Sequence, residues 1–186
     1  MKKLLILLVS MPISVFCVAQ DTITELQRIM RARIIEPGIE VEIPVNNQAT
    51  ISMLSGFSVG FSRRGGIFYD EPVVSFLLAP GIVLSYKYFY NFQSRVERNR
   101  RIAGNSGNYF GVSFRTGFPH IIRTGNFAPV DYFSFNIIPT WGMQRALGIF
   151  HLSLALGPGI YFNTKGDFGY SILVARFGIG IDVTRW

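Results

Sequence analysis

The chain contains stretches in which large apolar residues alternate with small or polar ones. In residues 50–62 one set reads Ile51, Met53, Phe57, Val59 and Phe61, and the other reads Thr50, Ser52, Gly56, Ser58, Gly60 and Ser62. This period of two is typical of a β-strand with two chemically different faces. Most of these stretches are also long enough to cross a bilayer as tilted strands of ~9–11 residues.

The same pattern predicts eight strands. Their expected ranges are 28–35, 39–45, 50–62, 75–91, 109–118, 132–143, 150–163 and 173–184. The first range has a competitor, because Thr22 and Glu25 resemble a helix capping box and Ile23, Leu26 and Met30 have helical spacing. A barrel with both termini on one side of a membrane needs an even number of strands, and this favours a strand over a helix.

Pro-Gly pairs punctuate the pattern. Pro37-Gly38 is expected to form a turn between the first two strands, and Asn46-Asn47 a tight hairpin turn. Pro80 and Pro158 fall inside predicted strands. Because proline cannot donate to the ladder, each indicates a bulge or bend.

Composition decides which solvent the apolar faces meet. Residues of the hydrophobic class make up 49% of the chain and charged residues only 16%, whereas ordinary domains carry about 25% charged residues. Too few charges remain to cover a water-facing surface. We therefore expect an all-β fold, a single antiparallel up-and-down transmembrane β-barrel of eight strands, with lipid outside and polar side chains in the lumen.

The N-terminus predicts export. Lys2 and Lys3 precede an apolar run from Leu4 to about Val15, and the small residue Ala19 precedes Gln20, as in a secretory signal peptide. The run is shorter than the ~20 residues of a membrane-spanning helix. Lipoprotein processing at Cys17 is the other alternative, but Phe16 is bulky for it. We expect residues 1–19 to be removed and residues 20–186 to form one barrel domain.

The charge balance bears on partners. The net charge of +7 would suit nucleic acid. In an exported protein, however, lipid and the phosphates of lipopolysaccharide are the expected counter-charge, and no nucleic acid is expected. Cations in the loops assigned to the outer side are candidate lipopolysaccharide contacts, with ordinary solvated charge as the alternative: Arg63, Arg64, Arg123 and Lys165.

Aromatic residues gather near one end of the strands. Tyr86, Tyr88, Tyr90 and Trp141 are expected to form an interfacial girdle, because amphipathic rings sit at the level of lipid headgroups. A cross-strand aromatic ladder in a soluble sandwich is the alternative. The connections at 46–47, 93–107 and 144–148 are assigned to the periplasmic side, and those at 63–72, 119–129 and 164–168 to the outside.

The lumen face carries both signs of charge. A neutralised polar network is expected among Arg31, Arg33, Glu40, Glu42, Lys87, Arg115, His151, Arg176 and Asp182. Glu40 and Glu42 are also candidates for an acid–base pair, although ion pairing is the favoured interpretation. An eight-stranded barrel is just wide enough for side chains to fill. The expected fillers are Phe89, Tyr109, Tyr132 and Tyr161.

These features together resemble the OmpA/OmpX-like superfamily of small outer-membrane β-barrels of Gram-negative bacteria. The resemblance rests on the end of the signal peptide, the PGIEVEIPVNNQATI hairpin, the YKYFYNFQSR segment and the terminal Trp186. It implies location in the outer membrane and insertion by the outer-membrane assembly machinery, which reads a C-terminal strand ending in an aromatic residue. Trp186 departs from that signal, because it is out of phase with Phe177, Ile179, Ile181 and Val183.

Catalytic chemistry has a second candidate besides the Glu40–Glu42 pair. His151-Leu152-Ser153 resembles the His-x-Ser of outer-membrane lipid A deacylases, in which the pair belongs to a hydrolytic triad. The asparagine that follows the serine in those enzymes is Leu154 here, and the pair faces the lumen. With two histidines and no mature cysteine, neither a metal nor a cofactor is expected. A non-enzymatic, structural or surface-interacting barrel is the favoured function; a lipid A hydrolase and a soluble exported barrel for a small ligand are the alternatives.

Overall fold

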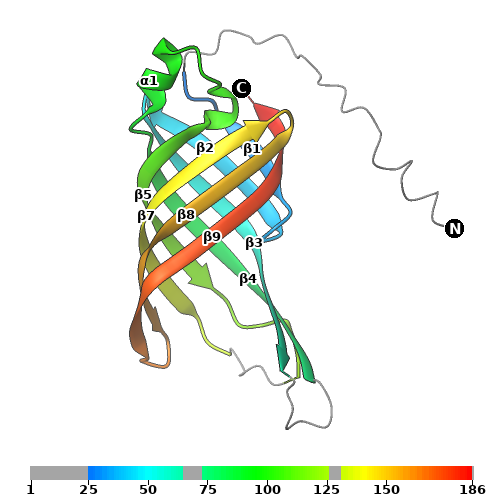
Figure 1. Ribbon diagram of the computed structural model, residues 1–186. Coiled ribbons are helices and arrows are strands. Elements are labelled where there is room, and N and C mark those ends of the chain that lie inside the picture. The colour runs from blue at the N-terminus through cyan, green and yellow to red at the C-terminus, as the bar shows by residue number, and fades with distance from the viewer. Residues whose placement is uncertain (1–24, 65–72, 126–130, 186) are drawn as a thin grey trace, which may run out of the picture.

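The computed structural model describes residues 25–64, 73–125 and 131–185 (Figure 1). Strands dominate it, and their bounds are β1 Ile29–Arg33, β2 Gly38–Asn46, β3 Ala49–Arg64, β4 Val73–Tyr88, β5 Gly107–Gly117, β6 Ile122–Thr124, β7 Ser134–Leu147, β8 Phe150–Asn163 and β9 Phe168–Arg185. A helix, α1 (Phe92–Glu97), and a 3-10 turn, η1 (Ala103–Asn105), lie between β4 and β5. No helix in the described part of the chain is both long and apolar enough to cross a membrane.

All pairings are antiparallel, and eight of the strands close into a ring. Each strand of the ring pairs with the next ring strand along the chain, β7 following β5. The short strand β6 pairs with β4, and β1 returns to pair with β9. The predicted all-β, eight-stranded up-and-down barrel is therefore confirmed. Residues 29–33 form a strand, so the helical alternative is wrong for this stretch. Residues 1–24, which include the predicted signal peptide and Thr22, lie outside the described residues, as does Trp186.

Several element bounds differ from the expected ones. Arg63 and Arg64 belong to the end of β3 and not to a loop. Residues 144–147 continue β7, which leaves a tight turn at Gly148-Ile149. The connections 93–107 and 119–129 contain α1, η1 and β6. In each case the period-two pattern was too short or too polar to reveal the extra turn of helix or the strand end.

The grouping of the connections agrees with the expected one. The connections that contain residues 46–49, α1 and 148–149 lie at one end of the barrel, here called the α1 end (Figure 1). The connections that follow β3, β5 and β8 lie at the opposite end, here called the far end (Figure 1). The assignment of these two ends to a periplasmic and an outer side stays a prediction.

Burial is inverted relative to a water-soluble domain. Large apolar side chains on the outer face are exposed along the strands, among them Ile51, Met53, Phe110, Val112, Phe177 and Val183. Charged and polar side chains occupy the interior, among them Arg31, Glu42, Thr50, Lys87, Gln144 and His151. The alternation therefore sorts side chains between an apolar exterior and a polar lumen.

A bulge interrupts the alternation in β8 and β9. The register shifts between Gly157 and Gly159 of β8. Two residues of β9, Ile172 and Leu173, lie opposite the single residue Pro158, and none of the three has a paired residue. The expected disruption at Pro158 is confirmed, whereas Pro80 pairs with Phe57 in an unbroken register. The bulge brings Phe168 and Tyr170 into register with Phe162 and Ile160, which lie on the outer face. Residues 168–172 therefore extend β9 beyond the predicted start at 173.

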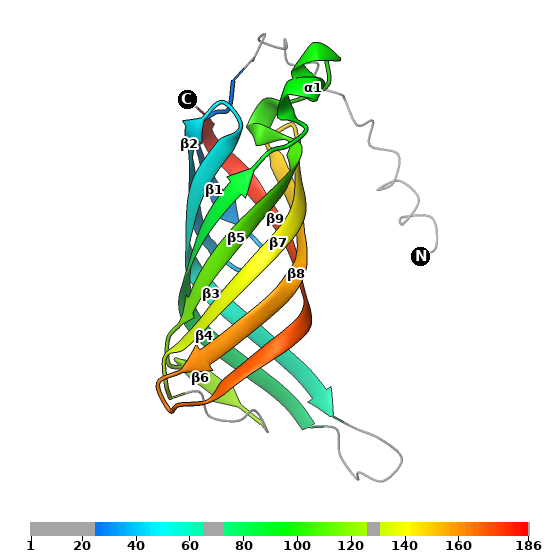
Figure 2. The same ribbon diagram turned by 90° about the vertical axis from the view of Figure 1, so that its left-hand side faces the viewer.

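The wall is complete only in the half nearer the α1 end. The β1–β2 turn ends half-way down the barrel, where Phe57 N donates to Pro37 O and Ile34 N donates to Ile179 O, both at 2.8 Å. Among the described residues, 58–64 of β3 and 168–178 of β9 have no strand partner on the side of this turn. Toward the far end, β3 and β4 diverge from β8 and β9 in both views (Figures 1 and 2). We call this opening the lateral gap.

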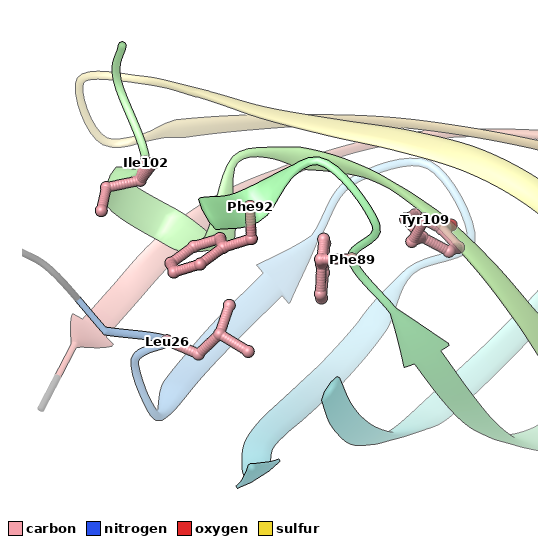
Figure 3. Close-up of a cluster of buried hydrophobic side chains, with 5 residues drawn as sticks. All are labelled: Leu26, Phe89, Phe92, Ile102 and Tyr109. Carbon is pink, nitrogen blue, oxygen red and sulfur yellow. The ribbon is translucent and has the colours of Figure 1, made fainter. Parts of the chain in front are cut away.

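An apolar cap covers the lumen at the α1 end. Phe89 and Phe92 pack with Leu26, Ile102 and Tyr109 where the β4–β5 connection folds over the barrel (Figure 3). The rings of Phe89 and Tyr109 are 5.5 Å apart. The predicted fillers Phe89 and Tyr109 are thus buried and Tyr132 is half-buried, whereas Tyr161 is exposed near the far end, where its ring lies over Gly169.

Candidate functional site

A buried ion network lies directly beneath the apolar cap, with Arg31 at its centre. Arg31 is fully buried and its guanidinium donates to three groups on three different segments. Nε reaches Asp182 Oδ1 at 2.8 Å, Nη2 reaches the carbonyl oxygen of Gly104 at 3.1 Å, and Nη1 donates to Glu42. Because these partners belong to β9, η1 and β2, the Arg31 side chain joins the first strand to the last one and to the cap.

Glu42 is the most heavily coordinated acceptor. Besides Arg31, it accepts from Thr50 Oγ1 at 2.9 Å and from Lys87 Nζ at 3.2 Å. Asn105 Nδ2 and Gln144 Nε2 also donate to it, each at 3.2 Å. A buried carboxylate with this many donors is satisfied as an anion.

Glu40 extends the network toward the middle of the barrel. It lies 3.3 Å from Lys87 Nζ and 3.0 Å from Arg33 Nη1. Arg33 also donates to Ser153 Oγ at 3.2 Å, and its guanidinium lies where a Cβ on Gly178 would have to be. The absence of a side chain at Gly178 therefore gives Arg33 its place against β9.

Sequence reasoning missed two polar members of this network. Gln144 was expected in a loop, but it lies in β7, fully buried, and donates to Asn105 O at 2.9 Å. Asn105 was hidden in a long connection; it binds the backbone of Gln27 and closes the network from above. Both have uncharged side chains outside the predicted strands, so no charge or alternation signal marked them.

A second, separate cluster lies beside the lateral gap. Glu36, in the β1–β2 turn, accepts from Arg115 Nη1 and from Arg176 Nη2, both at 2.8 Å. Arg115 also donates to Ser58 Oγ at 2.6 Å. Glu36 has a φ of 55°, a left-handed conformation that non-glycine residues rarely adopt. Its role was not predicted, because a turn residue carries no strand periodicity.

The lumen retains a small cavity between the two clusters. It has a volume of about 40 Å³, and its lining includes Arg33, Glu40, Ser153, Arg176 and Phe177. One water needs roughly 10–15 Å³ by the same measure, so the cavity has room for a few waters.

The candidate hydrolytic pair is placed in the lumen wall. His151 is fully buried, and neither of its ring nitrogens has a hydrogen-bond partner among the described residues. Ser153 bonds to Arg33 and not to His151. Glu40 is close enough to His151 to act on it electrostatically, but it is held by Arg33 and Lys87. The geometry thus lacks the serine–imidazole–carboxylate chain that activates a nucleophile.

The predicted girdle residues cluster on the outer surface near the α1 end. Tyr86, Tyr88, Tyr90 and Trp141 are all partly exposed, and Trp141 Nε1 donates to Tyr90 Oη at 3.1 Å. Tyr90 also packs on Phe110 at 5.1 Å between ring centres. Such rings, apolar with one polar tip, suit a membrane interface.

Two of the four candidate lipopolysaccharide contacts, Arg123 and Lys165, have described side chains. Lys165 pairs with Asp131 at 2.6 Å in the exposed far-end loops, and this hydrogen bond lowers the pKa of Asp131 and raises that of Lys165. Arg123 is exposed on β6. The side chains of Arg63 and Arg64 lie outside the described residues.

No cluster of three or more histidine, cysteine or acidic side chains suited to a metal occurs among the described residues. Comparisons with protein-family models, with curated proteins and with solved structures find no match to this chain. The site is therefore interpreted from its own geometry.

Proposed function

We propose that this protein is a non-enzymatic β-barrel of the bacterial outer membrane, with a plugged lumen and a structural or surface-interacting role. The observation that carries the proposal is the inverted burial of the strands, with apolar side chains exposed around the barrel and ion pairs buried inside it. In lipid, exposed apolar residues carry no penalty, and a closed ring satisfies backbone groups without water. The predicted signal peptide is consistent with export.

The partners that suit this proposal are lipid and lipopolysaccharide on the outside, and the assembly machinery during insertion. Lys165 and Arg123 are the far-end cations with described side chains that are exposed to such phosphates. Lys165 is already paired with Asp131, so its contribution depends on exchange of that carboxylate for a phosphate.

Cell fractionation tests the location. The full chain should sediment with the outer membrane, and its gel mobility should shift on heating, because a folded barrel resists denaturation by detergent. The matched variant Leu154→Arg places a charge on the outer face and should reduce the heat-shifted form, whereas Ser55→Ala, also on that face, should not. A protein recovered in detergent-free periplasmic extract would support the soluble ligand-binding alternative and overturn the proposal.

Planar-bilayer recording tests the plug. Because the apolar cap and the ion network fill the α1 end, reconstituted protein should show no steady channel of porin size. Large and stable currents from the wild-type protein would contradict a filled lumen.

Lipid A analysis separates the barrel from the hydrolase alternative. Cells that overexpress the wild-type chain should have an unchanged lipid A acylation pattern by mass spectrometry, and so should cells with His151→Ala. Loss of an acyl chain with the wild type, abolished by His151→Ala or Ser153→Ala, would establish the enzyme instead.

A further inference from the structure

The lateral gap presents two different chemistries at the same place. On its outer rims lie large apolar side chains, Phe57, Val59 and Phe61 on β3 and Phe168, Tyr170, Ile172 and Leu173 on β9. The β9 rim is the most exposed apolar surface of the strands, with Ile172 at 84% and Tyr170 at 76% exposure. Just inside the closed end of the gap lie the guanidinium groups of Arg115 and Arg176.

The inner cluster has an excess of positive charge. Arg115 and Arg176 share a single carboxylate, that of Glu36, and both arginine side chains remain partly exposed. Donor capacity also remains unused: the Nε atoms of Arg176 and Arg33 are buried and have no hydrogen-bond partner among the described residues, and the Arg33 side chain is only 7% exposed. An uncompensated cation facing lipid is unfavourable, so this arrangement favours an added anion.

The cluster reaches from one rim to the other. Arg115 is anchored to Ser58 at the start of the unpaired part of β3, and Arg176 belongs to the unpaired part of β9. Residues 58–64 of β3, which lack a partner on the gap side, extend about 23 Å at ~3.3 Å per residue. That exceeds the ~15 Å depth of one leaflet of hydrocarbon. An acyl chain from one leaflet therefore fits along the opening.

We propose that the lateral gap binds an anionic amphiphile, a molecule with one acyl chain and a phosphate or carboxylate headgroup. The acyl chain lies against the apolar rims, and the headgroup accepts hydrogen bonds from Arg176 and Arg115 in place of part of their contact with Glu36. The inference rests on the membrane location proposed above. It adds a specific ligand class and a binding site to a barrel whose α1 end is plugged.

Titration of the refolded mature chain in dodecyl maltoside tests this proposal, with dodecyl phosphate as the probe. Calorimetry should show saturable binding, and the Nε–H resonance of Arg176 should shift in NMR spectra. Inorganic phosphate alone should bind at least about tenfold more weakly, because it lacks the apolar contact. Equal affinity for inorganic phosphate would reduce the site to an anion site and overturn the amphiphile.

Two pairs of variants locate the site. Arg176→Gln should weaken binding of dodecyl phosphate by about tenfold or more, as expected for loss of a charged hydrogen bond. Arg98→Gln, the same change on the exposed loop after α1, should leave binding unchanged. Ile172→Asn on the rim should weaken the binding of dodecyl phosphate but not that of inorganic phosphate. Ile43 is exposed on β2 at the α1 end, and Ile43→Asn should leave the binding of both ligands unchanged.

Three further outcomes would overturn the proposal. They are unchanged affinity in Arg176→Gln, saturable binding of uncharged dodecanol with equal strength, and a dimer in which the unpaired edges of β3 and β9 are protected by a second copy. Heat-shifted gel mobility is recorded for every sample. Absence of saturable dodecyl phosphate binding to the wild-type barrel, when that barrel is heat-shifted, refutes the amphiphile site alone, whereas absence of the wild-type protein from the outer-membrane fraction refutes the proposed function.

Discussion

The two halves of this barrel are built from the same strands but differ in how they are closed. In the α1 half all eight strands pair, a buried ion network joins β1, β2, β4, β7 and β9, and an apolar cap covers it. In the far half β1 and β2 are absent, and two strand edges face each other across the lateral gap. The comparison shows that ring closure and lumen filling go together, because the two short strands that complete the wall also supply Arg31, Arg33, Glu40 and Glu42 to the buried network.

Hydrogen exchange should show the largest contrast between the halves. In β3, amides of residues 50–56 that point to β2 should exchange only with global unfolding, whereas those of residues 58–64 that point to the gap should exchange with almost no opening free energy. Mass spectrometry of the refolded barrel in neutral detergent measures this. The β4-facing amides of the same residues are the internal control. Uniform protection along both edges of β3 would remove the distinction between the halves.

Substitution of Arg31 should break the closed half. Arg31→Met leaves Glu42 and Asp182 without their shared cation in a buried site, and we expect a loss of about 3–5 kcal/mol of unfolding free energy. Urea unfolding in vesicles, followed by tryptophan fluorescence, measures this loss. Arg115→Met, in the partly exposed cluster beside the gap, is the matched control and should cost less. Equal losses would mean that the two clusters are equally important.

A charge on the outer face should lower the free energy of unfolding strongly at mid-strand and only slightly at the far end. Leu154→Arg, in the middle of β8, should cost ~2–4 kcal/mol in bilayers, whereas Phe168→Arg at the start of β9 should cost ~0–1 kcal/mol near the interface. The same vesicle unfolding assay applies. Similar costs at both depths would place the membrane elsewhere on the barrel.

The smallest expected effect is at the border between the halves. Ser153→Ala removes one hydrogen bond from Arg33 and should cost ~0.5–1.5 kcal/mol. Ser55→Ala, exposed on the outer face of β3, should be neutral in the same assay. A cost for Ser153→Ala as large as that for Arg31→Met would indicate that Ser153 has a role beyond this hydrogen bond.

Sequence periodicity predicted the eight strands and their faces because each alternating residue reports which side of a sheet it occupies. The pairing of Arg31, Glu42 and Lys87 followed from their shared lumen phase and opposite charge. Periodicity carries no information on how far along a strand its partner extends. The lateral gap therefore could not be predicted from β3 and β9, whose own patterns continue past the end of their partners.

The lumen positions of residues outside regular strands also could not be predicted from the sequence. Glu36 sits in a turn and Asn105 in η1, so their lumen positions depend on the path of the backbone and not on alternation. The bulge at Pro158 was expected because proline has no backbone N–H to donate. Its effect on the alternation of residues 168–172 in β9 was not expected, because that alternation can be followed across the bulge only once the pairing with β8 is known.

The contact between Arg31 and Asp182 has a kinetic consequence. These residues are 151 positions apart, and their strands form the seam of the ring. Such a contact forms only after β9 is available. The chain ends must therefore lose conformational entropy by coming together before the contact can stabilise the fold. Folding is therefore expected to be slow and to end with zipping of the seam. A nascent chain that lacks β9 would hold Arg31 without the carboxylate of Asp182, which disfavours premature closure.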